Sequence, residues 1–217
     1  MTTKSRKSCP HGRLMGSQTP SVRIAPEYDY TDGPDAVRVL AVSKLIVDPW
    51  QENVLNDWMG RTEEDVWSAP TCGLSVPRQN GKTLDTSGRI ASGMVMYGEW
   101  VIYTAHLQKT ATETFMELKG IFESRGMRKY VKEIKNALGR ERIVLTNGGR
   151  VVFVARTRNG GRGLHGDCLV FDEAQELTSE QQASFLPAIS ASRNPQTIYL
   201  GTPPDENCSG DVFRKIR

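Results

Sequence analysis

The sequence predicts an α/β fold with a mainly parallel sheet and helices on both faces. Three short apolar runs are expected to form buried strands: 72–76, 100–105 and 168–171. Each is followed by a segment that can form a helix: 82–97, 108–124 and 178–191. Strands that alternate with helices are typical of a parallel sheet, because a crossover helix returns the chain to the same end of the sheet.

The 217-residue chain is long enough for one good hydrophobic core, with 38% hydrophobic and 24% charged residues. Its net charge of +3 permits contact with nucleic acid without requiring it. No apolar run approaches the length of a membrane span, so we expect no membrane partner. The cysteines at 9, 72, 168 and 208 are scattered, which favours a reducing compartment. Cys9-Pro10-His11 resembles half of a zinc site, but the sequence offers no second half.

Residues 1–34 are expected to form an irregular, basic N-terminal arm. Its positive charges are unopposed by acid until Glu27: Lys4, Arg6, Lys7, Arg13 and Arg23. Two interpretations stay open, a solvated and poorly packed arm or a basic arm that lies near a polyanion. Residues 35–217 are expected to form the main domain.

One short stretch organises the rest of the chain: Val76-Pro77-Arg78-Gln79-Asn80-Gly81-Lys82-Thr83. It lies between a predicted strand and a predicted helix, which is the arrangement of a phosphate-binding P-loop. Lys82 is expected to contact the β- and γ-phosphates, and the Thr83 hydroxyl to take one Mg²⁺ coordination position. Val76 occupies the place of the usual leading Gly, so the alternative is a helix N-terminus with a solvated Lys.

A second stretch, Cys168-Leu169-Val170-Phe171-Asp172-Glu173, places two carboxylates at the end of a buried strand. Ligands bind at this end of the strands in open α/β sheets. Asp172 is expected to hold magnesium, and Glu173 to polarise the attacking water as a general base. A last strand at 197–200 leads to Thr202, which is either a γ-phosphate sensor or a simple turn residue. Together the two stretches predict nucleotide binding.

Other segments carry weaker signals. A short helix is expected at 50–59, with a shared face formed by Trp50, Val54, Leu55 and Trp58. Gln51 lies off that face, and the pattern alone makes it a surface residue. A further helix is expected near 127–137, and a hairpin around Asn147-Gly148-Gly149. The loop at 156–166 has three Arg and four Gly, which suits phosphate contacts or a solvated loop.

Six motifs stand in a characteristic order: Gln51, the loop at 77–83, Tyr103-Thr104-Ala105-His106, Gly161-Arg162-Gly163, Val170-Phe171-Asp172-Glu173-Ala174 and Leu200-Gly201-Thr202-Pro203. Over about residues 40–217 the chain resembles the large terminase subunit of tailed bacteriophages. Terminases characteristically have an Arg-Gln-x-Gly-Lys-Ser/Thr version of the Walker A loop, without the leading Gly. The resemblance implies a P-loop NTPase fold of the ASCE type.

The resemblance assigns nucleotide-binding roles residue by residue. Gln51 matches the Gln that reads adenine, and Arg78 matches the additional P-loop Arg that can stabilise transition-state charge. Lys82 and Thr83 match the phosphate and magnesium contacts. The rest of the nucleotide-binding loop is Pro77, Gln79, Asn80 and Gly81.

The resemblance also assigns catalytic roles. Asp172 matches the Walker B residue that holds magnesium, and Glu173 the catalytic Glu. Gly201-Thr202-Pro203 resembles the coupling motif that links hydrolysis to movement. Arg162 matches an arginine finger, in cis or from a neighbouring subunit, with Arg156 and Arg158 as alternatives.

By this resemblance the chain is the ATP-hydrolysing motor module of a terminase, with ATP and Mg²⁺ as cofactors. Such motors drive double-stranded DNA into the procapsid. The implied partners are DNA, the portal protein, the small terminase subunit and further copies of the chain in a homo-oligomeric ring. The implied location is the host cytoplasm of a bacterial cell, with transient attachment at the procapsid portal.

Large terminases usually carry a nuclease domain of RNase H type, and this chain stops soon after the coupling motif. We therefore expect no nuclease site, and an ATPase domain that is truncated at its C-terminal end. Two other functions stay open. One is a helicase-like DNA-dependent ATPase, since Asp-Glu-Ala-Gln also occurs in helicases. The other is a non-catalytic terminase assembly module that binds its partners without turnover.

Overall fold

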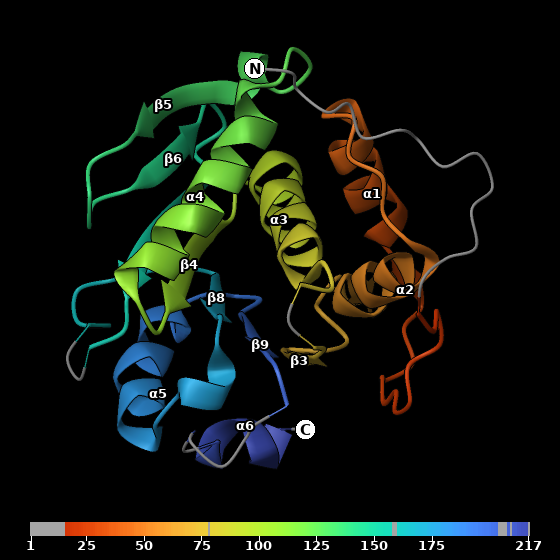
Figure 1. Ribbon diagram of the computed structural model, residues 1–217. Coiled ribbons are helices and arrows are strands. Elements are labelled where there is room, and N and C mark those ends of the chain that lie inside the picture. The colour runs from red at the N-terminus through yellow and green to blue at the C-terminus, as the bar shows by residue number, and fades with distance from the viewer. Residues whose placement is uncertain (1–15, 78, 158–159, 204–207, 209, 217) are drawn as a thin grey trace, which may run out of the picture.

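The computed structural model describes residues 16–77, 79–157, 160–203, 208 and 210–216. In this part of the chain, seven strands form one sheet in the order β3-β9-β8-β4-β7-β6-β5 (Figure 1). The strands are β3 (Thr71–Ser75), β9 (Gln196–Gly201), β8 (Cys168–Phe171), β4 (Trp100–Ala105), β7 (Arg150–Ala155), β6 (Arg142–Leu145) and β5 (Val131–Lys135).

The larger part of this sheet is parallel. Strands β3, β9, β8, β4 and β7 run in one direction, and β6 and β5 extend the sheet by antiparallel pairing. The carboxyl ends of the parallel strands therefore lie at one edge, where Ser75 pairs with Gly201 and Phe171 with Tyr199. The predicted α/β fold with a mainly parallel sheet is confirmed, and β9 separates β3 from β8.

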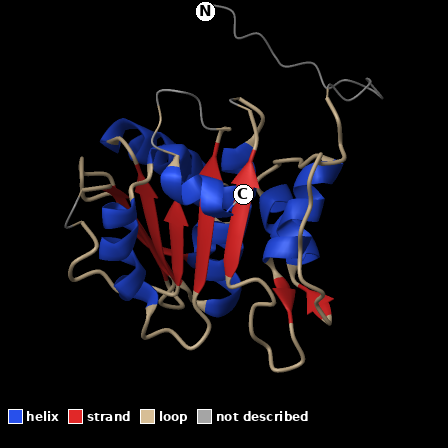
Figure 2. Ribbon diagram, turned by 90° about the horizontal axis from the view of Figure 1, so that it is seen from below, coloured by secondary structure: helices blue, strands red, loops and turns tan. Residues whose placement is uncertain are grey.

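Helices cover both faces of the sheet, as the strand arrows and surrounding helices of Figure 2 show. On one face lie α1 (Gly33–Val42), α2 (Pro49–Trp58), α3 (Lys82–Ser92) and α4 (Gln108–Glu123). On the other lie α5 (Ser179–Phe185) and α6 (Asp211–Ile216). Because side chains alternate along a strand, Val101 and Tyr103 of β4 join the first core, whereas Ile102 joins the second.

Most predicted elements have the expected type. A π-helical turn (Gly93–Tyr97) continues α3, and β6 and β7 form the expected hairpin. The helix expected near 127–137 is wrong, because a 3₁₀ turn (Arg128–Tyr130) leads there into β5. Pairing with β6 satisfies the backbone of this segment, and the half-buried Val131 and Ile134 pack on the first core. Strand pairing with β6 thus overrides the local helical pattern.

The described part of the N-terminal region runs beside α2. Strand β1 (Tyr30–Thr31) pairs antiparallel with β2 (Gly60–Arg61). Arg23 forms an ion pair with Asp57 of α2, at 2.6 Å between Nη2 and Oδ1. Residues 1–15, with the Cys9-Pro10-His11 motif, lie outside the described residues, so the division at residue 34 stays a prediction. No helix among the described residues is long and apolar enough to cross a membrane.

A fully buried arginine ties α3 to the sheet. The Arg89 guanidinium donates two hydrogen bonds to Glu99, at 2.6 and 3.0 Å, and one to Gln196 Oε1 at 2.8 Å. Gln196 in turn donates to the carbonyl of Trp58 at 2.7 Å. A Cβ atom at Gly93 would lie 1.9 Å from the Glu99 carboxylate, so only Gly fits beside this pair. The network joins α2, α3, β9 and the start of β4.

We expect Glu99→Gln to lower the free energy of unfolding by about 3 to 5 kcal/mol, because it leaves the buried Arg89 charge unpaired. Urea denaturation measures this change. The matched control is Glu133→Gln, which breaks the exposed Arg142–Glu133 pair on the same sheet and should cost less than about 1 kcal/mol. Equal losses in the two variants would contradict the assignment of Arg89–Glu99 as a structural support.

Candidate nucleotide-binding site

A tight loop joins β3 to α3. Gly81 has a φ of 83°, a left-handed conformation that favours glycine, and Gln79 has a φ of 63°. Gly81 immediately precedes the first residue of α3, and its carbonyl accepts the Leu84 N–H at 2.9 Å. The N–H groups of the first two helical residues have no carbonyl of a preceding helical turn to bind. Such a helix start attracts anions. Pro77, Gln79 and Asn80 are exposed at the loop, and Arg78 lies outside the described residues.

Helix α3, which follows the loop, and the end of strand β8, which carries the carboxylates, are joined by one ion pair. Lys82 Nζ donates to Asp172 Oδ1 at 2.7 Å, although the two residues are far apart in the sequence. The other Asp172 oxygen accepts from the Tyr103 hydroxyl at 2.5 Å, and the Glu173 N–H donates to Oδ1 at 2.8 Å. Burial raises the pKa of Tyr103 well above its ordinary value, and the nearby negative charge of Asp172 adds a smaller effect in the same direction. The Tyr103 hydroxyl is therefore protonated and acts as the donor.

Tyr103 is a site residue for which the sequence pattern predicts no role. It belongs to β4, and its hydroxyl also lies 2.9 Å from the Thr114 hydroxyl of α4. Its signal is its place in a predicted strand that ends at the same sheet edge as the two carboxylates. Polar side chains on such strands often face a site at that edge.

Glu173 occupies a strained turn directly after β8. Its backbone is left-handed, with φ 51° and ψ 47°, which is uncommon for a residue with a side chain. Its carboxylate oxygen Oε2 is buried and has no hydrogen-bond partner among the described residues. A carboxylate oxygen without an internal partner keeps its acceptor capacity for a group that enters the site with a ligand.

The arginines of the loop at 156–166 differ in burial. Arg156 is buried, and its guanidinium donates to backbone carbonyls rather than facing outward, so it is not placed to act as a finger. Arg162 is exposed, and Arg158 lies outside the described residues. The finger role of Arg162 stays a prediction.

Gln51 is not the surface residue that the helix pattern predicted, since only 4% of it is exposed. Its Oε1 accepts the Asp48 N–H at 2.8 Å, which caps α2, and its Nε2 donates to the Gly81 carbonyl at 3.2 Å. Tertiary contact with the loop accounts for the burial. The side chain lies beside the loop, as an adenine-reading residue would, but both ends of its amide have internal partners. The adenine role therefore stays a prediction.

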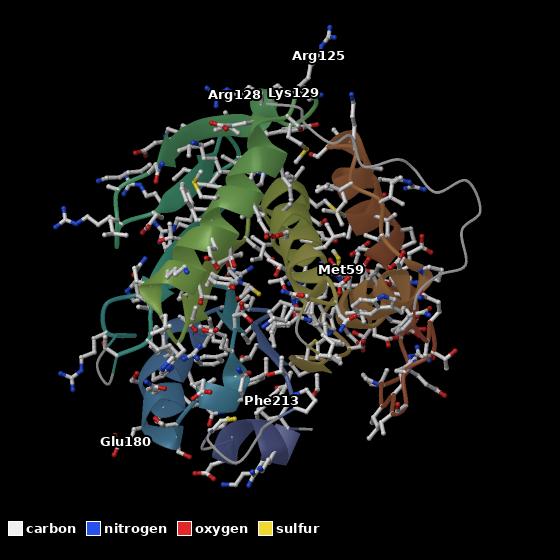
Figure 3. All side chains as sticks on the ribbon, in the orientation of Figure 1. Met59, Arg125, Arg128, Lys129, Glu180 and Phe213 are labelled. Carbon is white, nitrogen blue, oxygen red and sulfur yellow. The ribbon has the colours of Figure 1, made fainter. Side chains whose placement is uncertain are left out.

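The segment after β9 lies beside the loop. The Val76 N–H donates to the Gly201 carbonyl at 3.1 Å, and the Thr202 N–H donates to Gln175 Oε1 at 3.2 Å. Gly201 packs so tightly against Phe213 of α6, labelled in Figure 3, that a Cβ atom would lie 2.6 Å from the ring. Thr202 is half-buried. Gln175 thus connects the carboxylate turn to the segment at 201–203, a role that its residue type does not signal.

Two oxygen donors suit a magnesium ion. The Asp172 carboxylate and the half-buried Thr83 hydroxyl belong to the two stretches that the Lys82–Asp172 pair brings together. Among the described residues no group of three or more His, Cys, Asp or Glu could hold a metal. Mg²⁺ usually keeps several waters and takes one or two protein donors together with phosphate oxygens. The donor set therefore fits magnesium held with a nucleotide rather than a metal held by protein alone.

This fold matches solved structures of phage large terminases. The large terminase of bacteriophage HK97 superposes with a TM-score of 0.68 and 15% identity, over 85% of this chain and 40% of that chain. The ATPase domain of the Thermus phage P74-26 large terminase gives 0.58 and 16%, over 85% and 72%. The chain has the fold of a phage large terminase ATPase domain.

The large terminase of a thermophilic bacteriophage was solved with ADP, and matches with a TM-score of 0.53 and 12% identity over 79% of this chain and 38% of that chain. The complex of the same terminase with ATP-γ-S gives 0.51 and 17%, over 70% and 36%. The chain thus spans about two fifths of these two large terminases, from HK97 and from the thermophilic phage. No protein-family model matches the sequence, and no curated protein matches it.

Asp85 of α3 is fully buried, and neither carboxylate oxygen has a hydrogen-bond partner among the described residues. Burial raises its pKa from 3.8 to about 8, and the neighbouring Gln51 side chain opposes the shift only in part. The folded state therefore holds the proton more tightly than the unfolded state does. Its contribution to stability is present below about pH 4 and is lost as the pH rises towards 8.

Without nucleotide or Mg²⁺, we expect the free energy of unfolding to fall by about 3 to 4 kcal/mol between about pH 5 and pH 8 through this group, at about 1.4 kcal/mol per pKa unit. Asp85→Asn should abolish that part of the pH dependence in urea denaturation. The matched control is Asp35→Asn on α1, whose half-exposed carboxylate pairs with Arg38 at the surface, and it should leave that dependence intact. An unchanged pH profile in Asp85→Asn would refute the assignment.

Proposed function

We propose that the chain is the ATP-hydrolysing motor module of a phage large terminase. The observation that carries this proposal is the 2.7 Å contact between Lys82 and Asp172, which brings the phosphate-binding loop and the carboxylate strand into one site. The fold and the nucleotide-bound terminase structures support the proposal. The unpartnered Oε2 of Glu173 supports hydrolysis rather than binding alone.

In this function the start of α3 and Lys82 bind the phosphates of ATP, and Lys82 exchanges its contact with Asp172 for phosphate oxygens. Thr83 and Asp172 would hold Mg²⁺, which neutralises charge on the phosphates. Glu173 orients a water and takes its proton. Arg78, or the exposed Arg162 from the same or a neighbouring subunit, stabilises negative charge in the transition state.

The segment at 201–203 is proposed to pass the change at the site to a DNA-gripping surface. Its contacts with Gln175 and with the loop supply a physical route for such coupling. In the assembled motor we propose double-stranded DNA, the portal protein, the small terminase subunit and further copies in a ring as partners. The proposed location is the host cytoplasm, at the procapsid portal during packaging.

We expect Lys82→Ala to abolish ATP binding and turnover, because it removes the positive charge at the phosphates. Glu173→Gln should keep ATP binding and lower the hydrolysis rate by about 10²- to 10⁴-fold, the usual contribution of a general base. Phosphate release and binding of a fluorescent ATP analogue measure the two effects. Turnover that survives in Glu173→Gln would remove Glu173 from its role. Nucleotide binding by wild type without any turnover would support the non-catalytic assembly module.

A basic surface offers one place for DNA contact. Arg125, Arg128 and Lys129 lie after the end of α4, and Figure 3 shows them at the opposite end of the molecule from Phe213. This surface is therefore separate from any surface that the segment at 201–203 contacts. Backbone phosphates of DNA attract such clusters without regard to sequence.

We expect double-stranded DNA to stimulate ATP hydrolysis, and this stimulation to weaken between about 50 and 200 mM salt because phosphate contacts release counterions. Arg128→Gln with Lys129→Gln should reduce the stimulation and leave basal turnover unchanged. The matched control is Lys109→Gln with Lys119→Gln on α4, which removes the same charge elsewhere. Equal stimulation in both double variants would exclude this surface, and unwinding of strands by the chain would favour a helicase.

A further inference from the structure

Arg156 is a buried cation without an ion pair. It is the first residue after β7, and only 5% of it is exposed. None of the ion pairs among the described residues includes it. Burial lowers its pKa to about 10, and the charges of Asp172 and Glu173 oppose that shift. A guanidinium held at this cost in an interior position needs compensating hydrogen bonds.

Backbone carbonyls from two other strand ends compensate the two Nη atoms, whereas Nε is buried without a hydrogen-bond partner among the described residues. Nη1 donates to the carbonyl of Asp172 at 2.5 Å and to that of Thr104 at 3.2 Å, and Nη2 donates to the carbonyl of Glu173 at 3.0 Å. The Arg156 N–H also donates to the Ala105 carbonyl at 2.9 Å. One side chain therefore joins the ends of β4, β7 and β8.

We call these hydrogen bonds from Arg156 to the backbone carbonyls the Arg156 clamp. Two of them bind the carbonyls that flank the strained residue Glu173. The left-handed turn of Glu173 is intrinsically unfavourable for a residue with a Cβ atom. Such a conformation persists only where the surroundings over-determine it. The donors from Arg156 to the carbonyls on both sides of the Glu173 Cα atom provide that constraint, together with the Glu173 N–H bond to Asp172.

We propose that Arg156 is a positioning residue that holds Glu173 in its left-handed turn and so aims the Glu173 carboxylate at the attacking water. This inference rests on the proposed hydrolysis, and it gives Arg156 a role other than that of a finger. The planar guanidinium spans three carbonyls at fixed angles, which a Lys ammonium cannot reproduce.

The test separates positioning from mere support. Arg156→Lys keeps the charge and loses the fork, so kcat should fall by about 10- to 100-fold, as a small misplacement of a reacting group does. KM for ATP should stay within about twofold, because uniform binding is untouched. The matched control is Arg150→Lys, at the other end of β7, where Arg150 stacks 3.5 Å from the Trp100 ring. A kcat for Arg156→Lys equal to that of the control overturns the proposal.

The Glu173→Gln background sharpens this test. If Arg156 acts through Glu173, Arg156→Lys causes little further loss there in single-turnover hydrolysis, because residues that act as a unit are not additive. An equal loss in both backgrounds would assign Arg156 to general support and overturn the proposal.

A readout that needs no turnover distinguishes failure of this inference from failure of the proposed function. The backbone ¹³C chemical shifts of Glu173 report its left-handed conformation in nucleotide-free protein. They should change in Arg156→Lys and not in Arg150→Lys. If wild type hydrolyses no ATP, the proposed function fails while the shifts still test the clamp. Unchanged shifts in Arg156→Lys overturn the proposal whatever the activity.

Discussion

Burial of the Asp172 carboxylate is the constraint on which the site depends. A carboxylate removed from water must be given charge or hydrogen bonds in return. Asp172 obtains them from Lys82 of α3, Tyr103 of β4 and the N–H of its own neighbour Glu173. These partners come from three parts of the chain, so satisfying one side chain fixes the loop helix, the central strand and the carboxylate turn relative to one another.

The topology then decides what else can communicate with that centre. Because β9 lies between β3 and β8, the chain leaving β9 emerges between the loop and the carboxylates. On the loop side, the Gly201 carbonyl accepts a hydrogen bond from the Val76 N–H. On the carboxylate side, the Thr202 N–H donates to the Gln175 side chain. A segment in that place contacts both halves of the site. Physical contact, rather than distance alone, makes it a candidate for coupling.

The sequence predicted the parts of this molecule whose signal is local. Apolar runs such as Cys168–Phe171 and the Gly-Lys-Thr turn specify strand, loop and helix through neighbouring residues. The misses depend on strand pairing and tertiary contacts, which the residue types alone do not encode. β5 carries Lys132 and Glu133 and is a strand because β6 pairs with it. Gln51 is buried because the loop at Gly81 packs against it. The hydrogen bonds of Arg156 could not be predicted from residue types, because their acceptors are backbone carbonyls that every residue carries.

At Glu173 the proposed catalytic role of the side chain and the stability of the fold favour different residues. Glycine adopts this conformation without penalty, so by backbone preference alone position 173 suits a residue that has no side chain. A residue with a carboxylate side chain at this position is therefore less favourable for the stability of the fold than glycine would be. A laboratory selection for thermal stability alone would favour glycine at this turn and would lose the proposed hydrolysis with it, which is the trade-off that functional sites impose on stable scaffolds.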